Sequence, residues 1–201
     1  DPNFKKNISG ATKAGIKVGL YFFTQAVNEA EAVEEASMAM SLASGYKVTY
    51  PIFIDTESAS GGRANGLSKS ARTAVVKAFC QTVRNGGYKA GVYASKSWYA
   101  NQLNASALNG YCIWVAQYNS SCTYSGKYDM WQATSGGSVN GISGNVSISF
   151  WMDEKEAAKD HGVLRQDPVS GNWYVYTDDD RINTGYNGLI LYNNIWWYVK
   201  D

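Results

Sequence analysis

The sequence predicts an α/β domain with a mostly parallel sheet, followed by a small module of β-hairpins. Short apolar runs alternate with helix-like segments through the first three quarters of the chain, which is the pattern of a parallel sheet covered by helices. The polar residues of chemical interest follow the ends of predicted strands, as they do in β/α barrels. After Trp151 the composition changes to aromatic and turn residues. We therefore expect a TIM-like β/α barrel domain at residues 1–151, a linker at 152–161 and a hairpin module at 162–201.

Six apolar runs are expected to form strands, at residues 18–23, 50–55, 90–94, 113–118, 128–132 and 146–150. Helices are expected between the earlier strands, at residues 28–43, 68–84 and 98–103. Asn28 and Ser68 are suitable N-caps for the first two helices, and Gly45 and Gly86 are suitable stops. No glycine-rich phosphate loop follows the first predicted strand, which favours a barrel over an open dinucleotide-binding sheet.

Composition and charge exclude several classes of protein. The chain has 201 residues, of which 45% are hydrophobic and 17% charged, so it is globular rather than disordered. A net charge of +1 leaves no electrostatic footprint for nucleic acid or an anionic membrane. No apolar run approaches the roughly 18 residues that a spanning helix needs. No signal peptide is visible, and because Asp1 is not a natural start we expect the natural N-terminus to lie upstream.

The cysteines and the histidine narrow the possible chemistry. Cys80, Cys112 and Cys122 have no metal-ligand spacing, and the sole histidine, His161, cannot complete a site, so we expect no metal or other cofactor. Three free thiols and one Cys112–Cys122 bridge both remain open. A Ser-His-Asp or Cys-His mechanism is disfavoured because His161 lies beyond the main domain. Hydrolytic chemistry in this chain would therefore depend on carboxylates.

A pair of carboxylates follows the second predicted strand. Asp55 and Glu57 are two residues apart, which in a strand places both side chains on one face with Cα atoms about 6.5–7 Å apart. Glycoside hydrolysis needs a proton donor on the leaving oxygen and a negative group near the cationic centre. Two neighbouring carboxylates also push their pKa values apart, so that one stays protonated near neutral pH. Solvated loop carboxylates or a helix N-cap would explain the same pattern without chemistry.

Six segments follow one another in a fixed order: Asp1–Phe4 with Ala14–Phe23, Pro51–Glu57, Gly91–Tyr93, Ile113–Tyr118, Tyr128–Gln132 and Gly141–Ser147. In this order and spacing they resemble the barrel strands of glycoside hydrolase family 25 lysozymes. The resemblance implies a peptidoglycan hydrolase that cleaves the β-1,4 bond between N-acetylmuramic acid and N-acetylglucosamine. It makes Glu57 the general acid and Asp55 a partner that orients or stabilises. Attack by the sugar's own acetamido group belongs to the known exceptions to the two-carboxylate rule.

The sequence departs from the family pattern in two places. The family begins with a strand that carries an aspartate, followed by a second strand, and both would precede Asp1. The last strand of the family usually carries another aspartate, and the corresponding residue here is Ser147. From these departures we expect the 201-residue chain to be inactive even when folded. Ser147 favours a rival interpretation, a degenerate protein that binds the cell wall without cutting it, whereas the intact Asp55 and Glu57 favour an enzyme.

Aromatic and polar residues near strand ends are the remaining candidates for substrate binding. By the resemblance, the cleft would contain Tyr21, Tyr93, Tyr118, Trp131, Gln132 and Ser147. The aromatic rings would stack on sugar faces, and Gln132 would donate a hydrogen bond. The alternative for each ring is packing in the barrel core or against helices. For Gln132 the alternative is a satisfied polar group at a strand end.

Two aromatic copies about 24 residues apart mark the C-terminal segment, a spacing typical of stacked repeats. They contain Trp173 and Tyr174 in the first copy and Trp196 and Trp197 in the second. The segment resembles the cell-wall-binding repeats of Gram-positive surface proteins, which implies binding of choline or a wall glycan and a secreted, wall-associated protein. The alternative is that the tryptophans form the module's own core. No nucleic-acid partner and no membrane span are expected.

Overall fold

The computed structural model describes residues 1–152, 163–177, 181–184, 188–192 and 195–199. The chain falls into two compact units. Unit 1 comprises residues 1–115 and 125–128, and unit 2 comprises residues 116–124 and 129–201. Residues 153–161 of the predicted linker and the acidic segment 178–180 lie outside the described residues. The predicted domain boundaries therefore remain a prediction.

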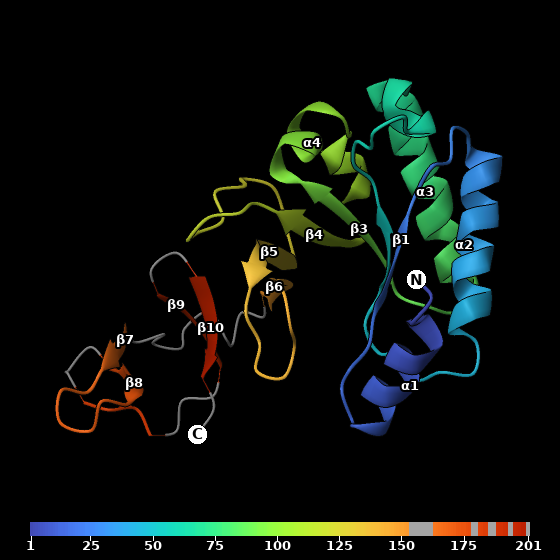
Figure 1. Cartoon of the computed structure of the whole chain (residues 1–201). Helices are drawn as coiled ribbons and strands as arrows, with labels where there is room; N and C mark the ends of the chain where they lie inside the picture. Colours follow the sequence, from blue (N-terminus) through green and yellow to red (C-terminus); the bar gives the residue numbers. More distant parts are fainter. Residues whose placement is uncertain (153–162, 178–180, 185–187, 193–194, 200–201) are drawn as a thin grey trace. The chain divides into compact units, whose positions relative to one another are not determined.

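Unit 1 contains most of the parallel sheet and all of the described helices (Figure 1). Its strands are β1 (Leu20–Phe23), β2 (Ile52–Asp55), β3 (Ala90–Ser95) and β4 (Cys112–Ala116). The helices are α1 (Phe4–Lys13), α2 (Glu29–Ala43), α3 (Lys69–Asn85) and α4 (Lys96–Asn101), with short 3₁₀ turns η1 (Arg63–Gly66) and η2 (Ala105–Leu108). The predicted alternation of strands and helices is confirmed.

One six-stranded sheet has the order β1-β2-β3-β4-β5-β6, in which the order in space is the order in sequence. Strands β1, β2 and β3 are parallel, and Leu20, Ile52 and Ala90 lie in register across them. Strands β5 (Met130–Gly137) and β6 (Val146–Trp151) pair antiparallel, with register shifts after Gln132 and after Thr134. The predicted α/β class with a mostly parallel sheet is therefore confirmed.

Several element boundaries differ from the sequence prediction by two residues or more, and helix α1 was not predicted. β5 runs to Gly137, five residues beyond the predicted end, because the antiparallel partner β6 extends the ladder through small and polar residues. α4 begins at Lys96 rather than Trp98, because the side chain of Ser95 accepts a hydrogen bond from the backbone N–H of Trp98 and caps the helix earlier. The predicted caps Asn28 and Ser68 do cap α2 and α3 through their side chains.

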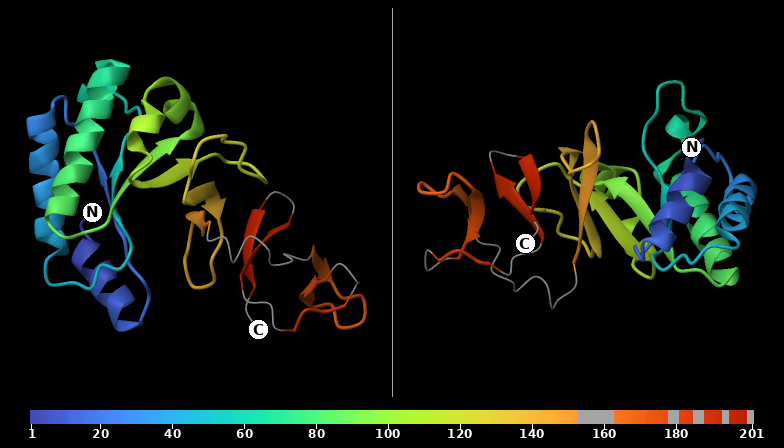
Figure 2. Two further views of the ribbon diagram at one scale, coloured as in Figure 1. Left: turned by 180° about the vertical axis from the view of Figure 1, so that it is seen from behind. Right: turned by 60° about the horizontal axis from the view of Figure 1, so that its bottom comes forward.

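Helices α2 and α3 lie side by side on one face of the parallel strands (Figure 2). The buried face of α2 is a row of small residues, Ala32, Ala36, Ala39 and Ala43, at helical spacing. The buried face of α3 carries larger groups, including Val76 and Phe79, which are fully covered. Pairing a small face with a large one lets the two helices approach closely while still filling the space between them.

The three cysteines are free thiols, so the predicted alternative without a disulfide holds. Cys80 on α3 is fully buried, and its Sγ lies 3.6 Å from the carbonyl oxygen of Gly91, to which it donates. Burial raises the pKa of this thiol far above its ordinary value. The group is therefore a packing residue rather than a nucleophile.

Unit 2 contains β5, β6 and two hairpins. The hairpin strands are β7 (Val163–Gln166) with β8 (Trp173–Tyr176), and β9 (Gly188–Tyr192) with β10 (Ile195–Val199), each pair antiparallel. Leu164 and Val175 of the first hairpin share a small core with Ile190 of the second. Asp167 shapes the first turn by accepting hydrogen bonds from the backbone N–H groups of Val169 and Ser170. Each hairpin is thus too small to bury its apolar face alone, as expected for stacked copies.

Candidate active site

Asp55 and Glu57 lie where β2 ends and the following loop begins. The neighbouring strands hold this end of β2 on both sides. The backbone N–H of Thr24 donates to the carbonyl oxygen of Asp55 at 3.0 Å, and the N–H of Thr56 donates to the carbonyl oxygen of Tyr93 at 3.1 Å. Asp55 is 7% exposed, whereas Glu57 is exposed. The pair thus combines one carboxyl inside the structure with one at its surface.

The register of the parallel strands decides which way the Asp55 carboxyl faces. Phe22 packs against Phe79 of α3, with ring centroids 6.3 Å apart, so this side chain points to the helix layer. Tyr21 and Phe23 alternate with Phe22 and point to the opposite face of the sheet. Asp55 lies in register with Phe23 on one side and Tyr93 on the other. The carboxyl of Asp55 therefore lies on the face away from the helices.

Aromatic rings cover the same face of unit 1. Trp114 contacts Phe53 with ring centroids 5.1 Å apart and Tyr93 with centroids 4.8 Å apart, both edge to face. Gly91 makes room for this cluster, because a Cβ atom there would lie 2.3 Å from the ring of Phe53. Toward β1 the face opens, since Tyr21 is 68% and Phe23 is 38% exposed. Two exposed rings beside a carboxylate pair suit the stacking of sugar rings.

Burial and charge both act on Asp55. Loss of solvent and, to a smaller extent, the neighbouring charge of Glu57 together raise the pKa of its carboxyl to about 7. The Oδ1 atom of Asp55 is buried and has no hydrogen-bond partner among the residues that the structure describes. A buried carboxyl oxygen without a donor is costly in a folded protein. Such an atom at the end of a strand is typical of a functional site.

A hydrogen-bond network from α2 fixes the end of β1. The carboxylate of Glu35 accepts from the hydroxyl of Thr24 at 2.5 Å and from the backbone N–H of Gln25 at 2.9 Å. The side chain of Gln25 in turn accepts from the backbone N–H of Arg63 at 2.9 Å. The loop that follows Glu57 is thereby tied to the end of β1.

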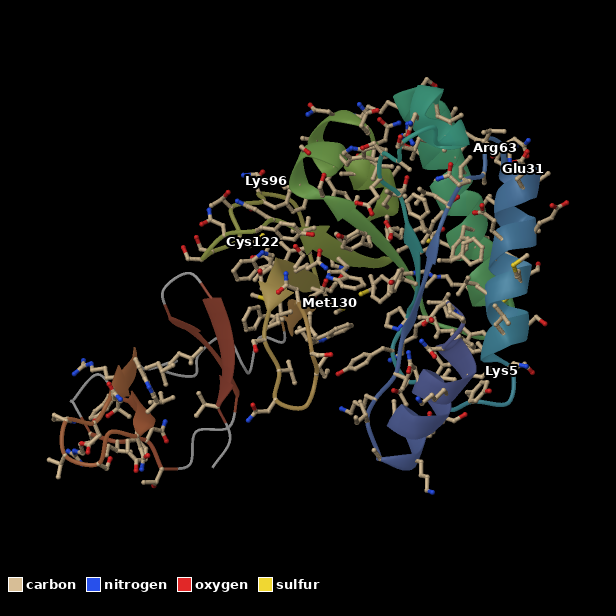
Figure 3. The ribbon with its side chains drawn as sticks, viewed as in Figure 1. Lys5, Glu31, Arg63, Lys96, Cys122 and Met130 are labelled. Atoms are coloured by element: carbon tan, nitrogen blue, oxygen red, sulfur yellow. The ribbon has the colours of Figure 1, made fainter. Side chains whose placement is uncertain are left out.

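An ion pair between Arg63 and Glu31 connects the same loop to α2. Nη2 of Arg63 donates to both carboxylate oxygens of Glu31, at 2.9 and 3.1 Å (Figure 3). Within the loop, Asn65 closes a ring by donating to the carbonyl oxygen of Ala59 and accepting from its N–H. Together these bonds limit the freedom of the segment that carries Glu57.

Four of the predicted substrate-binding residues, Tyr118, Trp131, Gln132 and Ser147, lie in unit 2. The hydroxyl of Tyr118 donates to Oε1 of Gln132 at 3.1 Å, and Tyr118 is 59% exposed whereas Gln132 is 6% exposed. Ser147 on β6 is exposed, and it lies on the same face as Ser149, the register partner of Gln132. Tyr118 and Gln132 therefore form a bonded polar pair on unit 2, and Ser147 lies on the same face of β6 as the residue that pairs with Gln132.

The surroundings of Trp131 and Tyr93 fit packing in the core better than stacking on substrate. Trp131 is 7% exposed, stacks on Phe150 with centroids 5.5 Å apart, and donates from Nε1 to the carbonyl oxygen of Gln117. Tyr93 is 8% exposed and packs against Trp114. Both rings already have aromatic partners, so Tyr21 and Tyr118 are the exposed tyrosines of the predicted set.

In the C-terminal hairpins, Trp173 is 45% exposed and Tyr174 is partly buried. Tyr176 carries the guanidinium of Arg165 above its ring at 5.3 Å. The side chains of Trp196 and Trp197 lie outside the described part of the structure, although the backbone of both residues pairs with β9.

Comparison with known proteins identifies the family to which this site belongs. Residues 1–142 match the family described as Glycosyl hydrolases family 25. The chain belongs to this family. The match contains the predicted carboxylate strand, and it extends from α1 to the loop between β5 and β6.

Relatives and solved structures agree with this membership. The chain is similar to the "Autolytic lysozyme" of Clostridium acetobutylicum, with 29% identity over 154 residues that cover 76% of this chain and 45% of that protein. It is also similar to the modular autolysin LytC of Streptococcus pneumoniae, with 26% identity, a TM-score of 0.65, and coverage of 74% of this chain and 37% of LytC. The chain therefore spans less than half the length of these two relatives.

A third similarity concerns the fold alone. A family 25 glycosyl hydrolase from Bacillus anthracis aligns with a TM-score of 0.66 at 22% identity, over 78% of this chain and 74% of that one. Among the described residues, no helix is long and apolar enough to cross a membrane. The same part of the family 25 chain contains no cluster of His, Cys, Asp or Glu that could hold a metal ion.

The residues that fix the end of β1 and the loop after Glu57 were not predicted from the sequence. Glu35, Thr24, Gln25 and Arg63 connect the end of β1 with the loop after Glu57. Glu35 is one of several glutamates on α2, and nothing in its spacing separates it from solvent-facing neighbours. Phe23 could have been found, because in a strand it shares a face with Tyr21, whereas Phe22 between them lies against the helices.

The raised pKa of Asp55 predicts how stability changes with pH. In the unfolded family 25 chain this carboxyl titrates near 3.8, whereas in the folded chain it titrates near 7. Between these values the folded state binds more protons than the unfolded state, so the free energy of unfolding falls as the pH rises from about 4 to 7. We expect Asp55→Asn to remove this pH-dependent decrease in the free energy of unfolding. The variant should then be more stable than the unaltered protein at pH 8 by on the order of 2 kcal/mol.

Urea unfolding at pH 5 and pH 8 measures this effect. Glu34→Gln, which neutralises an exposed carboxylate on α2, is the matched control and should leave the pH dependence unchanged. A pH dependence in Asp55→Asn equal to that of the unaltered protein would contradict the assignment of the buried proton to Asp55.

Proposed function

We propose that this chain is the catalytic part of a peptidoglycan hydrolase, which cleaves the β-1,4 bond between N-acetylmuramic acid and N-acetylglucosamine. The observation that carries the proposal is the pair of Asp55 and Glu57, one buried and one exposed, at the carboxyl end of β2 in a family 25 chain. The similarity to an autolytic lysozyme and to an autolysin supports this substrate class. The LytC autolysin has also been solved in complex with a synthetic peptidoglycan ligand.

Glu57 is the proposed general acid. Its side chain is exposed at the end of the aromatic face, where a leaving glycosidic oxygen can approach it, and its loop is held by the bonds of Gln25 and Arg63. The proton passes from Glu57 to the glycosidic oxygen while the bond from that oxygen to the anomeric carbon breaks. The resulting carboxylate then takes a proton from the water that completes hydrolysis.

Asp55 is the proposed orienting group. Its buried Oδ1 can accept the N–H of the substrate acetamido group, which would give this oxygen a donor. Held in this way, the acetamido oxygen attacks the anomeric carbon as the leaving group departs, and the negative charge of Asp55 stabilises the positive ring that forms. The side chain must be ionised for this role, so binding of the N–H donor should lower its pKa from about 7.

The remaining predicted residues are proposed to bind the glycan. Tyr21 and Phe23 offer exposed rings beside Asp55 for stacking against sugar faces. The bonded pair of Tyr118 and Gln132 offers polar groups to sugar hydroxyls. Ser147 occupies the position at which the family usually has an aspartate, and a serine supplies no charge to a cationic transition state.

The C-terminal hairpins are proposed to bind the cell wall. The proposed organisation is a hydrolase domain at residues 1–151, a linker at 152–161 and a wall-binding module at 162–201. Trp173 is 45% exposed and the small core of the module is formed by aliphatic residues, so the exposed surface of this ring can contact a ligand. A flat exposed indole suits a wall sugar or the quaternary ammonium of choline. A secreted, wall-associated location follows from this substrate and this module.

We expect Glu57→Gln to lower the rate of peptidoglycan cleavage by roughly 10²–10⁴-fold, because the amide has nearly the same shape but cannot donate the proton. The release of reducing ends from purified peptidoglycan measures the rate, with the protein made as its gene encodes it. Glu29→Gln, an exposed glutamate in the first turn of α2, is the matched control. Near-normal cleavage by Glu57→Gln would remove Glu57 from the mechanism.

We expect Ser147→Asp to raise the cleavage rate roughly tenfold or more, because it restores the carboxylate that the family usually carries at this position. Ser143→Asp makes the same change in the loop before β6 and should leave the rate unaltered. The same reducing-end assay serves both variants. A slower Ser147→Asp enzyme would show that the serine is suited to this chain as it is.

We expect Trp173→Ala to weaken sedimentation with purified walls while leaving cleavage of short soluble glycans unchanged, because the ring binds wall and takes no part in chemistry. Val169→Ala removes another exposed apolar side chain, 94% exposed, from the turn of the same hairpin and serves as control. Equal losses in both assays would instead assign Trp173 a structural role.

A further inference from the structure

The charges of unit 1 are separated along its strands. Unit 1 contains thirteen Lys and Arg residues and seven Asp and Glu residues, although the whole chain has a net charge of only +1. All of its acidic residues except Asp1 lie between residues 29 and 57, in the first two turns of α2 or at the end of β2. Because α2 begins where β1 ends, these carboxylates gather at the carboxyl ends of the strands, where the candidate active site lies.

Lysines gather at the opposite end, where the strands begin. Six of them belong to α1 or to the segments that lead into β1, β2 and β3: Lys5, Lys6, Lys13, Lys17, Lys47 and Lys89. We call this set the lysine face. In Figure 3 the labelled Lys5 lies at the end of unit 1 opposite to Glu31 and Arg63.

Ring packing and backbone hydrogen bonds bring the lysine-bearing segments together. Phe4 packs edge to face against Tyr46, with centroids 6.3 Å apart, so the start of α1 lies beside the turn that carries Lys47. The backbone of Val18, which follows Lys17, accepts from the N–H groups of Thr49 and Tyr50. The carbonyl oxygen of Lys89 accepts from the N–H of Ile52 at 2.9 Å. The three strand-leading segments are therefore neighbours.

The charges of the lysine face are not neutralised within the described part of the chain. All six lysines are exposed, and none of them takes part in an ion pair with a described residue. The only acidic residue of unit 1 at this end is Asp1, whose carboxylate accepts from the backbone N–H of Asn3. Six like charges on one face repel one another and lower folding stability slightly, which a bound anion would relieve.

We propose that the lysine face binds an anionic phosphodiester polymer of the bacterial cell wall, a chain of the polyol-phosphate type. This inference rests on the proposed function in one respect: a peptidoglycan hydrolase works among such polymers. The lysines are spread over four segments and form no enclosed pocket, so they suit a long chain with repeated charges rather than one small anion. All six are lysines, and flexible point charges fit a mobile phosphodiester chain without the forked geometry by which arginine reads nucleobases.

The position of the lysine face allows this binding to orient unit 1. Polymer bound at the amino ends of the strands leaves the carboxyl ends, with Asp55 and Glu57, free to meet the glycan. At the carboxyl ends of the strands, six carboxylates outnumber Arg63, Lys69, Arg72 and Lys96, so this end would attract the polymer less than the lysine face does. The charge separation therefore orients the domain, with its site directed away from the anionic polymer and toward neutral glycan.

Binding to an unsubstituted synthetic poly(glycerol phosphate), measured as a function of salt, tests the proposal. The test variant is Lys5→Gln/Lys17→Gln/Lys47→Gln, which removes three charges from the lysine face. The matched control is Lys69→Gln/Lys77→Gln/Lys96→Gln, which removes three charges from α3 and the start of α4. Both variants have the same net charge, so only the location of the loss differs between them.

We expect the lysine-face variant to lose about tenfold or more in affinity at low salt, and its plot of log affinity against log salt to become shallower by about 2. The control should bind nearly as the unaltered protein does. Equal losses in the two variants would overturn the assignment of the surface, because net charge alone would then explain binding. No binding at low salt, or tighter binding to single-stranded DNA than to the polymer, would overturn the choice of partner.

Cleavage of short soluble glycans separates this proposal from the proposed function. The lysine-face variant should cleave such fragments at the unaltered rate, since none of its substitutions lies near Asp55 or Glu57. A protein that binds the polymer through the lysine face but cleaves no glycan would refute the hydrolase and keep the surface. If the protein cleaves glycan but the two variants lose polymer binding equally, the hydrolase would stand and the lysine face would be refuted as the binding surface.

Discussion

The parallel register of β1, β2 and β3 is the constraint on which the site depends. It sets Phe23, Asp55 and Tyr93 side by side, and it fixes which face each of them occupies. A shift of β2 by one residue would turn Asp55 toward the helices and Ile54 toward the aromatic face. The register is secured by apolar packing on the helix side, where Ile52, Ile54 and Val92 are fully buried. Apolar packing on the helix side of the sheet thus fixes the position of the Asp55 carboxyl on the opposite face.

The same arrangement accounts for the properties of Asp55. Neighbouring strands cover its backbone and rings surround its side chain, so the carboxyl loses water without gaining a donor for Oδ1. Glu57, two residues later, has left the sheet and remains exposed. The two carboxylates therefore differ in exposure, because Asp55 ends the strand whereas Glu57 belongs to the following loop. Differences in environment of this kind are how a single fold separates the roles of two acids.

The sequence predicted β1 to β4 and helices α2 and α3 because each has a strong local signal, whereas helix α1 was not predicted. The apolar runs before Asp55 and around Val92 are bounded by turn residues, and Asn28 and Ser68 cap helices by their own side chains. The end of β5 was missed because Ser135 and Gly136 carry no strand signal, and only their antiparallel partner makes them a strand. Long-range pairing of this kind is not visible in local sequence.

The site was predictable to the extent that its residues are marked by type and spacing. Asp55 and Glu57 could be found because the segment that carries them resembles the family's carboxylate strand, whereas the pair alone also fits solvated loop residues or a helix N-cap. The burial of Tyr93 and Trp131 could not be foreseen, since an aromatic residue at a strand end fits core and cleft equally well. The ties between Glu35, Gln25 and Arg63 depend on segments up to 38 residues apart in the chain, and only the fold brings those segments together.

The order of strands in the sheet has a consequence for how the chain acquires its structure. Because each strand from β1 to β6 lies beside the next one in the sequence, every new strand finds its partner already synthesised. The crossovers from β1 to β2 and from β2 to β3 each contain a helix, and the entropy lost in closing a loop grows only slowly with its length. Growth from one edge, strand after strand, can therefore accompany translation, and the newest edge strand is the one that waits unpaired. The order in which the strands pair can then follow the order in which they are synthesised.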